Sequence, residues 1–398
     1  MQRTYNQTFC SAPFIHMYVH KNEDIRACCM TTEYGLVHDN TELDLEKRWR
    51  SKYYRDLRQQ FLDGKEPEIC TKCFSTEKHG GTSDRIRFNR IYSDILEPNV
   101  ETGNQYESPI DLDLRPGNLC NLKCRMCGPV SSSQIQKETQ SNISVQEIFG
   151  KGDIIETEGV FDGKNLEFLL RNADKGRRIK FLGGEPTIMP EVDDMLSLMI
   201  ANGQTDIPLH FTTNVTNNTE KFISKISQFK NVAFNYSVDG TGKVVEYIRH
   251  PVSFDKLNDN IAVYQTIAEQ GEFGDGGIGF TYQAYNFFNL YDTFKWSLRL
   301  GVNFWVDLLV GPDWCSVLCI PKNIRDKELL RLRKILAKQT ANNIIPTIDR
   351  ILEDDREYGL TQLARYTKIL DKNRKQHIKD FIPEIWEIIR EEYDAIQL

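Results

Sequence analysis

Three cysteines in one short stretch of this 398-residue sequence have a spacing that suits metal chemistry. The stretch RPGNLCNLKCRMCGP, residues 115–129, contains Cys120, Cys124 and Cys127. Soft thiolates hold iron–sulfur clusters, whereas a structural zinc site usually takes four protein ligands. Three thiolates can ligate three irons of a [4Fe–4S] cluster and leave the fourth iron open, which is typical of a catalytic site. A zinc loop completed by a distant ligand is the alternative.

A second group of cysteines lies upstream of that stretch. Its members are Cys10, Cys28, Cys29, Cys70 and Cys73. A β-hairpin predicted over residues 14–30 would bring Cys10 near Cys28 or Cys29, and the C-x2-C loop that follows would supply two more thiolates. Zinc and a [4Fe–4S] cluster both fit four thiolates, and the pattern leaves the choice between Cys28 and Cys29 open.

The last two cysteines, Cys315 and Cys319, are spaced to share one face of a helix, although the apolar run around them also suits a strand. The first interpretation is structural, because buried free cysteines are common as small hydrophobic residues. The sharper hypothesis is a hydrogen-atom donor or an acid in an active site.

The bulk composition excludes several classes of protein. A formal net charge of −7 argues against a general nucleic-acid binder. The first residues lack the apolar core of a signal peptide, and no run approaches the ~18 apolar residues needed to span a bilayer. We therefore expect a cytoplasmic protein with no membrane partner, whose cysteines serve metal binding or catalysis rather than disulfides.

The elements that must position these cysteines form an alternating α/β pattern. Six apolar segments are predicted as strands, with helical segments between them: residues 109–116, 178–184, 208–214, 232–239, 276–285 and 302–310. The alternation implies right-handed crossovers and a parallel sheet, and six units fit a partial (β/α)6 TIM-like barrel. Chemistry in such barrels lies at the carboxyl ends of the strands, where the three-cysteine loop falls.

Three domains are expected along the chain. Residues 1–100 form a cysteine-rich domain with the β-hairpin and a helix over residues 45–64. Residues 101–320 form the barrel. Residues 321–398 form amphipathic helices that pack against it, because apolar residues recur there at helical spacing among charges.

The motif CNLKCRMCG, residues 120–128, resembles the cluster motif of the radical S-adenosylmethionine (SAM) superfamily. FLGGEPTIMPE, residues 181–191, resembles the glycine-rich motif of that superfamily at its second strand. The resemblance implies that Cys120, Cys124 and Cys127 hold a [4Fe–4S] cluster, and that SAM binds its open iron.

The same resemblance implies further SAM-binding residues after successive strands. Gly183 and Gly184 allow the backbone to approach a ligand closely, and Glu185 would meet the ammonium group of SAM. Polar residues after the next strands would contact its ribose and carboxylate; they are Asn214, Ser237 and Arg249. A guanidinium suits a carboxylate because it binds in a bidentate manner.

The upstream cysteines resemble those of a twitch domain, the shortened relative of the SPASM domain, here placed before the barrel. Domains of this kind bind an auxiliary iron–sulfur cluster in radical SAM enzymes. The resemblance therefore implies a second cluster, expected to be [4Fe–4S].

These features together predict a radical SAM enzyme. The resemblance implies that a reduced cluster cleaves SAM to methionine and a 5′-deoxyadenosyl radical, which abstracts hydrogen from a substrate. A peptide or protein substrate is favoured, with a small molecule such as a sugar as the alternative, and a flavodoxin or ferredoxin is the kind of electron donor required. Two other classes stay open: a non-catalytic iron–sulfur electron-transfer protein, and a zinc-stabilised module that binds nucleic acid or protein.

Overall fold

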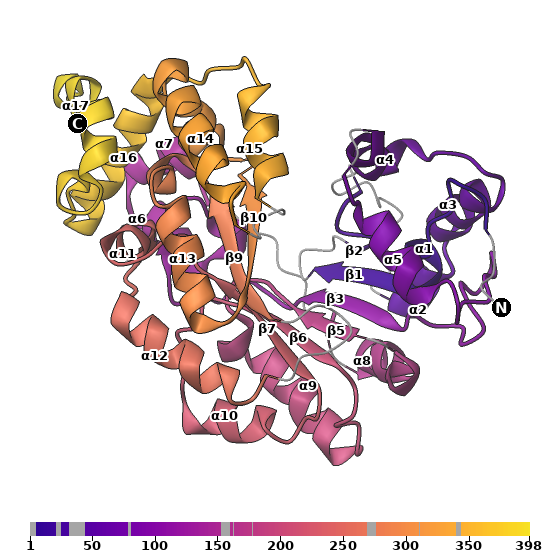
Figure 1. Ribbon diagram of the computed structural model, residues 1–398. Coiled ribbons are helices and arrows are strands. Elements are labelled where there is room, and N and C mark those ends of the chain that lie inside the picture. The colour runs from indigo at the N-terminus through magenta and orange to yellow at the C-terminus, as the bar shows by residue number, and fades with distance from the viewer. Residues whose placement is uncertain are drawn as a thin grey trace. The chain divides into compact units, whose positions relative to one another are not determined.

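The computed structural model describes most of the chain in two compact units (Figure 1). The described residues are 5–20, 25–31, 44–78, 81–152, 160–161, 163–176, 178–268, 276–309, 311–339 and 344–398. The first unit comprises Met1–Gly117, Ile154–Phe211 and Thr219–Ala233. The second comprises Asn118–Asp153, Thr212–Asn218 and Phe234–Leu398. Each unit combines separate stretches of the chain, so the two units do not test the predicted domain boundaries at residues 100 and 320.

The strands form a sheet with the order β10-β9-β7-β6-β5-β3-β1-β2. Their bounds are His16–His20 for β1, Ile25–Arg26 for β2, Asp111–Arg115 for β3, Arg178–Phe181 for β5, Leu209–Thr213 for β6, Val232–Ser237 for β7, Gly277–Tyr282 for β9 and Asn303–Leu308 for β10. All six strands predicted for the barrel are present, and the prediction of a parallel α/β fold of the partial-barrel type is confirmed.

The N-terminal hairpin belongs to this sheet. Strands β1 and β2 pair antiparallel, as the sequence predicted, but β1 also pairs in parallel with β3 over its whole length. The sequence instead predicts that the hairpin belongs to a separate N-terminal domain. Pairing between strands far apart in sequence leaves no local pattern that would reveal it.

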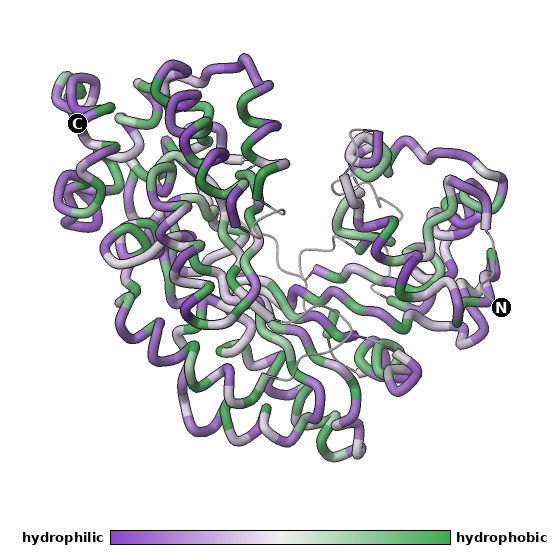
Figure 2. The backbone as a smooth tube through the Cα atoms, in the orientation of Figure 1, coloured by the Kyte–Doolittle hydropathy of each residue, from purple (hydrophilic) through white to green (hydrophobic). Residues whose placement is uncertain are grey.

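Along the strands of the first unit, hydrophilic and hydrophobic residues alternate (Figure 2). One face carries buried apolar residues, such as Leu112 and Leu114 on β3 and Ile179 and Phe181 on β5. The other face carries charged and aromatic side chains from the intervening positions. The period of two follows from strand geometry, in which successive side chains point to opposite faces.

The N-terminal helices differ from the prediction in two ways. Their bounds are Ala12–Ile15 for α1, Leu45–Trp49 for α2, Lys52–Leu62 for α3, Thr71–Lys78 for α4 and Asp84–Tyr92 for α5. The single helix predicted over residues 45–64 is broken because Ser51 has an extended backbone, with ψ at 163°, and begins α3. The predicted C-x2-C loop is helical, with Cys70 ending a 3-10 turn and Cys73 within α4.

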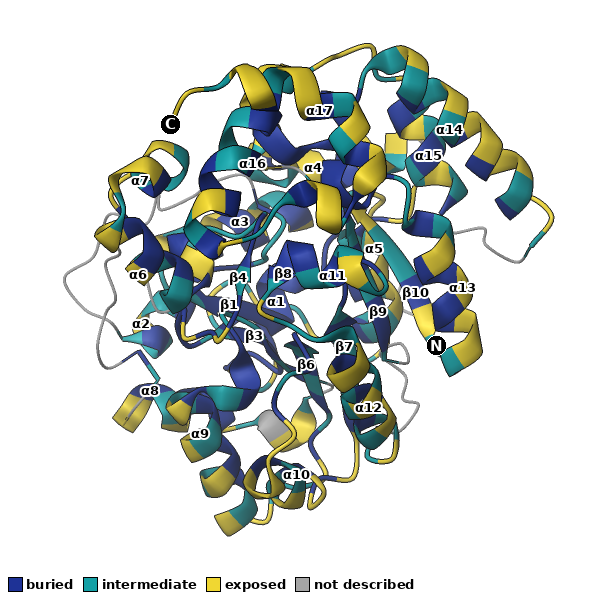
Figure 3. Cartoon of the chain, turned by 90° about the vertical axis from the view of Figure 1, so that its left-hand side faces the viewer, coloured by how far each residue is buried: buried dark blue, intermediate teal, exposed yellow. Residues whose placement is uncertain are grey.

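The remaining helices alternate with the barrel strands or follow them. Their bounds are Ser133–Ser141 for α6, Ile143–Phe149 for α7, Gly163–Leu170 for α8, Pro190–Ala201 for α9, Glu220–Ile226 for α10, Lys243–Ile248 for α11, Phe254–Gln265 for α12 and Leu290–Leu300 for α13. The C-terminal helices are Lys322–Leu336 for α14, Ile345–Leu352 for α15, Leu360–Arg374 for α16 and Pro383–Ala395 for α17. Figure 3 shows that α16 and α17 each have buried and exposed residues, which agrees with the amphipathic pattern in the sequence. No helix of the described chain is long and apolar enough to cross a membrane.

Candidate metal centres

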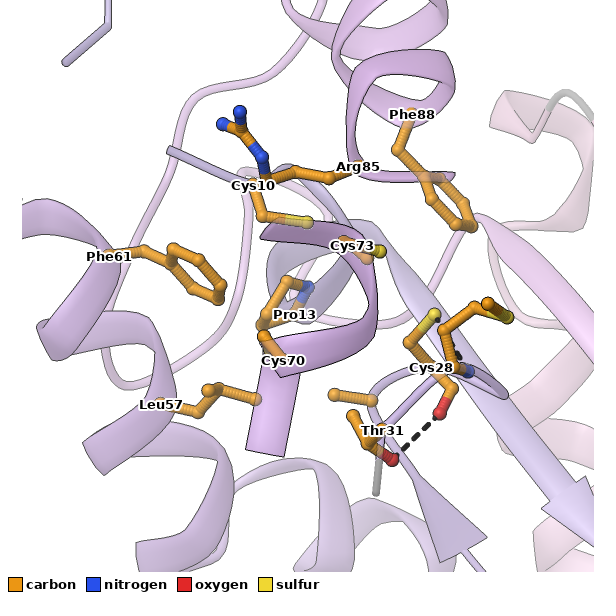
Figure 4. Close-up of a pocket in the computed structure, with 13 residues that line it drawn as sticks. Cys10, Pro13, Cys28, Thr31, Leu57, Phe61, Cys70, Cys73, Arg85 and Phe88 are labelled. Atoms are coloured by element: carbon orange, nitrogen blue, oxygen red, sulfur yellow. Dashed lines mark hydrogen bonds between the residues drawn. The ribbon is translucent and has the colours of Figure 1, made fainter. Parts of the chain in front are cut away.

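Four of the five upstream cysteines line one pocket in the first unit: Cys10, Cys28, Cys70 and Cys73. The pocket contains about 400 Å³ of space not filled by atoms, part of it open to solvent. Its other walls are mostly apolar, with Leu57, Phe61 and Phe88 among them. Figure 4 shows the sulfur atoms of Cys10, Cys28 and Cys73 pointing toward a common space. Three separate segments of the chain therefore contribute four cysteines to the lining of one pocket.

The electrostatics of this pocket favour a bound cation. Burial raises the pKa of the Cys10 thiol, and Cys70 and Cys73 raise it further because negative charges would repel one another there. Arg85 opposes the rise, and its guanidinium is itself held by Glu77 and by the carbonyl of Phe9. Four thiolates in an apolar pocket carry more charge than one arginine offsets. A metal centre that binds the thiolates removes this cost, so the donor set fits an iron–sulfur cluster.

The adjacent residues Cys28 and Cys29 have different surroundings. Cys28 lines the pocket and Cys29 does not. The pKa of the Cys29 thiol is lowered to about 7, first by a hydrogen bond with the Cys28 thiol, while burial and Asp113 oppose the shift and Lys180 supports it. Cys29 therefore lies within electrostatic reach of charged side chains on β3 and β5. The structure thus distinguishes the two cysteines, because Cys28 lines the pocket and Cys29 does not.

The three-cysteine loop lies in the second unit. Cys120 and Cys124 are buried and pack with Leu122, and the partly buried Met126 and Cys127 lie against them. A short strand, β4 (Lys123–Cys124), pairs antiparallel with β8 (Arg249–His250), so that Cys124 lies opposite Arg249. The pKa of the Cys127 thiol is raised first by its hydrogen bond with Cys124 and then by burial, and the negative charge of Cys120 adds to the rise. The three thiols are thus close enough to influence one another.

Neither cysteine group forms a site for a single ion. Among the residues that the structure describes, no three His, Cys, Asp or Glu side chains are grouped so that they could hold one metal ion. An iron–sulfur cluster would instead use the thiolates as ligands of several irons, which suits a donor set made of cysteines alone.

Two of the predicted SAM-binding residues contact the cysteines of this loop. The Nδ2 atom of Asn214 lies 3.8 Å from Cys120 Sγ and donates to Asn121 Oδ1 at 3.0 Å. Arg249 donates from Nη1 to Cys124 Sγ at 3.7 Å and from Nε to Asp239 Oδ2 at 2.7 Å. Donors at a sulfur favour its thiolate form. Accordingly, the pKa of the Cys124 thiol is lowered, first by Cys127 and also by Arg249, against the effect of burial.

The segment that carries Asn214 has an unusual backbone. Val215 has a positive φ of 60°, which is strained for a β-branched residue. Its amide donates to Thr213 Oγ1 at 3.0 Å, and its carbonyl accepts from Asn260 at 2.8 Å. This turn lets Thr216 accept a hydrogen bond from Asn121 at 2.7 Å. Asn214 and Thr216, the residues on either side of Val215, therefore both form hydrogen bonds with Asn121 of the cysteine loop.

The loop is also fixed by Arg125, which lies between Cys124 and Cys127 in sequence and is completely buried. Its Nη2 atom donates to Asp371 Oδ1 at 2.6 Å, and its Nε atom donates to the carbonyl of Tyr247 at 3.1 Å. The guanidinium lies 3.6 Å from the centre of the Tyr247 ring. A residue of α16 therefore anchors the middle of the cluster motif.

A second ion pair connects α16 to the helix that follows the loop. Glu138, on α6, accepts from Arg374 Nε at 3.1 Å and from Arg374 Nη2 at 2.9 Å, and both side chains are buried. Lys123 of the loop lies 3.6 Å from the same carboxylate. The C-terminal helices that the sequence assigned to structural support thus hold the cysteine loop directly.

The glycine-rich motif lies in the first unit, at the end of β5. Gly183 has a φ of 123°, and a Cβ atom there would lie 2.7 Å from the Gly117 carbonyl oxygen. The amide of Gly184 donates to that same oxygen at 3.1 Å. The motif therefore packs against the backbone that enters the cysteine loop. The Glu185 carboxylate is fully buried and accepts from the backbone amide and the hydroxyl of Thr187, at 3.2 and 2.6 Å.

Replacing Gly183 with alanine should lower the free energy of unfolding by about 2–4 kcal/mol, because it adds backbone strain and a clash with a carbonyl oxygen. Gly203→Ala is the matched control, since Gly203 has a φ of 68° but nothing lies within 4 Å of its Cβ position. That variant should lose only about 1 kcal/mol. Urea unfolding measures both losses, and equal losses would show that the close approach to Gly117 is unimportant.

The remaining predicted site residues do not join either cysteine group. Ser237 is the last residue of β7 and is half-buried. Cys315 and Cys319 end two 3-10 turns, Asp313–Cys315 and Val317–Cys319, rather than sharing a helix face. Burial raises the pKa of the Cys319 thiol to about 12. Both thiols lie next to backbone carbonyls, which fits the structural interpretation; a role as hydrogen-atom donor stays a prediction.

Sequence reasoning missed the residues that hold the loop in place. Arg125 lies inside the predicted motif, so its position between two predicted cluster ligands was the available signal. Asp371 and Arg374 resemble the other charges on a solvent-facing helix, and nothing local distinguishes them. Asn121 was noted only as part of the motif.

Two family models match stretches of the chain that contain the two cysteine groups. The model of the radical SAM superfamily matches residues 114–265, which include the three-cysteine loop. The SPASM model, an iron–sulfur cluster-binding domain, matches residues 10–74, which include the upstream cysteines. No curated protein matches the chain significantly.

Several solved structures resemble the chain at low sequence identity. SuiB of Streptococcus suis bound to S-adenosylmethionine is 16% identical with a TM-score of 0.39, and the match covers 80% of this chain and 70% of that one. SuiB bound to its precursor peptide SuiA is 15% identical with a TM-score of 0.37, covering 80% and 64%. Native anSMEcpe with bound AdoMet is 17% identical with a TM-score of 0.40, covering 56% and 59%.

Both matched domains imply iron–sulfur clusters, and their positions coincide with the two groups of thiols. The chain therefore carries a radical SAM domain at residues 114–265 and, before it, an iron–sulfur cluster-binding domain of the SPASM family at residues 10–74.

Proposed function

We propose that this radical SAM enzyme modifies a peptide or protein, with one catalytic and one auxiliary cluster. The observation that carries the two-cluster part of the proposal is the number of thiols at each centre. The loop offers three, Cys120, Cys124 and Cys127, which leaves one iron of a [4Fe–4S] cluster for SAM. The N-terminal pocket offers four, which closes the auxiliary cluster to other ligands.

When bound, a reduced cluster at the loop supplies the electron that cleaves SAM to the 5′-deoxyadenosyl radical. The contribution of the chain is binding and orientation. Asn214 and Arg249 donate to the sulfurs of Cys120 and Cys124, and so stabilise those thiolates. Arg249 is oriented by its ion pair with the buried Asp239.

The predicted cofactor-binding residues complete the proposal. The backbone of Gly183 and Gly184 would lie along SAM, and the buried carboxylate of Glu185 would bind its ammonium group. Ser237 and Arg249 would contact its ribose and carboxylate. A flavodoxin or ferredoxin is the proposed electron donor.

Anaerobic incubation of the reconstituted enzyme with dithionite and SAM tests the reaction, with 5′-deoxyadenosine measured by mass spectrometry. We expect 5′-deoxyadenosine only when the reductant is present. Cys124→Ala should lower its formation by about 100-fold or more, because the cluster loses a ligand. Formation at the wild-type rate in that variant would contradict the assignment of the loop.

Deuterium transfer tests the class of substrate. Host cells are grown in deuterated medium, and their extract is separated by size into a peptide and protein fraction and a small-molecule fraction. Deuterium should enter 5′-deoxyadenosine from the first fraction. Transfer from the small-molecule fraction alone would overturn the peptide proposal and favour a substrate such as a sugar.

A further inference from the structure

The polar face of the sheet in the first unit is arranged in rows across the strands. The register aligns His16 with Asp111 and Arg178 in one row. One step nearer the carboxyl ends, it aligns Tyr18 with Asp113, Lys180 and His210. Arg115 lies beyond Asp113 on β3, opposite His20 on β1. Rows of this kind line the interior of a barrel, where apolar side chains are the usual filling.

The first row is satisfied within the protein. Asp111 is fully buried and lies 2.5 Å from His16 Nδ1, 2.5 Å from the Tyr92 hydroxyl and 3.1 Å from Arg178 Nη2. The carboxylate neutralises the arginine, and Tyr92 of α5 covers this end of the row. These contacts give the first row a structural role.

The second row is not satisfied in the same way. Asp113 is only 2% exposed, yet its Oδ1 atom accepts no hydrogen bond from any described residue. The nearest cation is Arg115, whose Nε atom lies 3.8 Å away and likewise has no hydrogen-bond partner in the described chain. Both ring nitrogens of His210 are shielded from solvent and also have no partner there. A buried polar atom without a hydrogen-bond partner destabilises the folded protein. A bound ligand that provides partners for these atoms would account for their presence in the sheet.

The charges of the second row select the chemistry of that ligand. Lys180 and Arg115 carry positive charges, and Asp113 carries a negative charge in the same row. Burial lowers the pKa of His210 well below its usual range, and Lys180 and Arg178 lower it further, so its ring is neutral. Because Asp111 already compensates Arg178, the row keeps a positive excess that suits an anionic group. Asp113 and His210 remain able to bind amide groups beside that anion.

We propose that the row of Asp113, Lys180 and His210, with Arg115 beside it, is a substrate-recognition site that binds a carboxylate-bearing peptide. Lys180 and Arg115 bind the carboxylate, while Asp113 accepts a hydrogen bond from a peptide amide and His210 donates one or accepts one. The inference rests on the proposed function for its peptide class. The carboxylate is either an acidic side chain or a free C-terminus.

The position of the row along the chain agrees with such a role. Arg115 ends β3 immediately before the cysteine loop, and Lys180 lies in β5, which leads into the glycine-rich motif. His210 lies in β6, which leads to Asn214. The strands that carry the row therefore also lead to the residues assigned to the cofactors.

Peptide pools test the proposal directly. The probes are random hexapeptides, acetylated and amidated at their ends, with one central position fixed as Glu, Gln or Lys. Retention by the reconstituted enzyme is measured by ultrafiltration and mass spectrometry. The Glu pool should be retained about tenfold better than the Gln pool, as a charge-assisted hydrogen bond predicts. A fourth pool, with Gln at the centre and a free C-terminal carboxylate, identifies a C-terminal source of the anion.

Variants connect the preference to the row. Lys180→Gln and Arg115→Gln should each reduce the preference for a carboxylate, and Lys180→Glu should shift it toward the Lys pool. Lys221→Gln is the matched control, because Lys221 is exposed on α10 and pairs with Asp193 away from the row. It should keep the wild-type preference.

Two results would overturn the inference: equal retention of carboxylate and amide pools by the wild type, or a preference that survives both Lys180→Gln and Arg115→Gln. Iron content and 5′-deoxyadenosine formed without peptide establish that each variant is folded and loaded. These readouts also separate the two proposals. If the wild-type enzyme retains the Glu pool but never cleaves SAM, the proposed function is refuted and the row is supported as a carboxylate-binding site.

Discussion

Replacing Cys28 with alanine should remove about half of the iron and labile sulfide that the reconstituted enzyme binds, whereas replacing Cys29 should remove almost none. Cys28 lines the pocket with three other thiols, so its loss leaves the auxiliary cluster with three ligands in an apolar pocket. Cys29 lies outside the pocket lining. Colorimetric iron and sulfide analysis measures the difference, and electron paramagnetic resonance of the reduced protein shows which cluster is lost.

The two cysteines are matched controls for each other, because the same change is made at neighbouring positions. Cys120→Ala should remove the other half of the iron, and the double variant of Cys28 and Cys120 should bind almost none. The opposite pattern, with iron lost from Cys29→Ala and kept by Cys28→Ala, would reverse the assignment.

Replacing Asp371 with alanine should lower the free energy of unfolding by about 3–5 kcal/mol, because it leaves the Arg125 guanidinium buried without its anion. Asp371 also accepts hydrogen bonds from the Tyr247 hydroxyl at 2.8 Å and the Ile378 amide at 2.9 Å. The variant should therefore lose the catalytic cluster at lower urea concentrations than the wild type does. Urea unfolding, followed by circular dichroism and by cluster absorbance, measures both effects.

Asp394→Ala is the control for that experiment, since Asp394 is an exposed carboxylate on α17. It should change stability by no more than about 0.5 kcal/mol. Replacing both partners, with Arg125→Met and Asp371→Leu, should cost less than Asp371→Ala alone, because no buried charge is left unpaired. A double variant less stable than Asp371→Ala would show that the ion pair is not the source of the effect.

Local patterns were enough to predict the strands and the cysteine groups. Each barrel strand is a short apolar run, and the spacing of Cys120, Cys124 and Cys127 is contained within a single loop. Breaks and pairings that depend on distant residues were not predictable in this way. The break at Ser51 and the parallel pairing of β1 with β3 are examples, because both depend on how the folded chain packs.

The choice between Cys28 and Cys29 shows the same limit within the site. Cys28 and Cys29 lie in the turn that follows β2, and only the folded position of this turn decides which of them faces the pocket. Asn214 and Arg249 were predicted from the sequence as polar residues that follow their strands. Their contacts with the sulfurs of Cys120 and Cys124 depend on pairings such as β4 with β8, which are two residues long and leave no pattern in the sequence.

The anchoring of Arg125 has a consequence for how the enzyme is made. Asp371 and Gln376, which bind its guanidinium, follow it by 246 and 251 residues in the chain. During synthesis the cysteine loop leaves the ribosome long before these residues exist, and it remains unanchored until they have been translated and α16 has docked. In the growing chain the Arg125 guanidinium therefore lacks its anion, and it can be buried in its final place only once Asp371 has been made and α16 has folded.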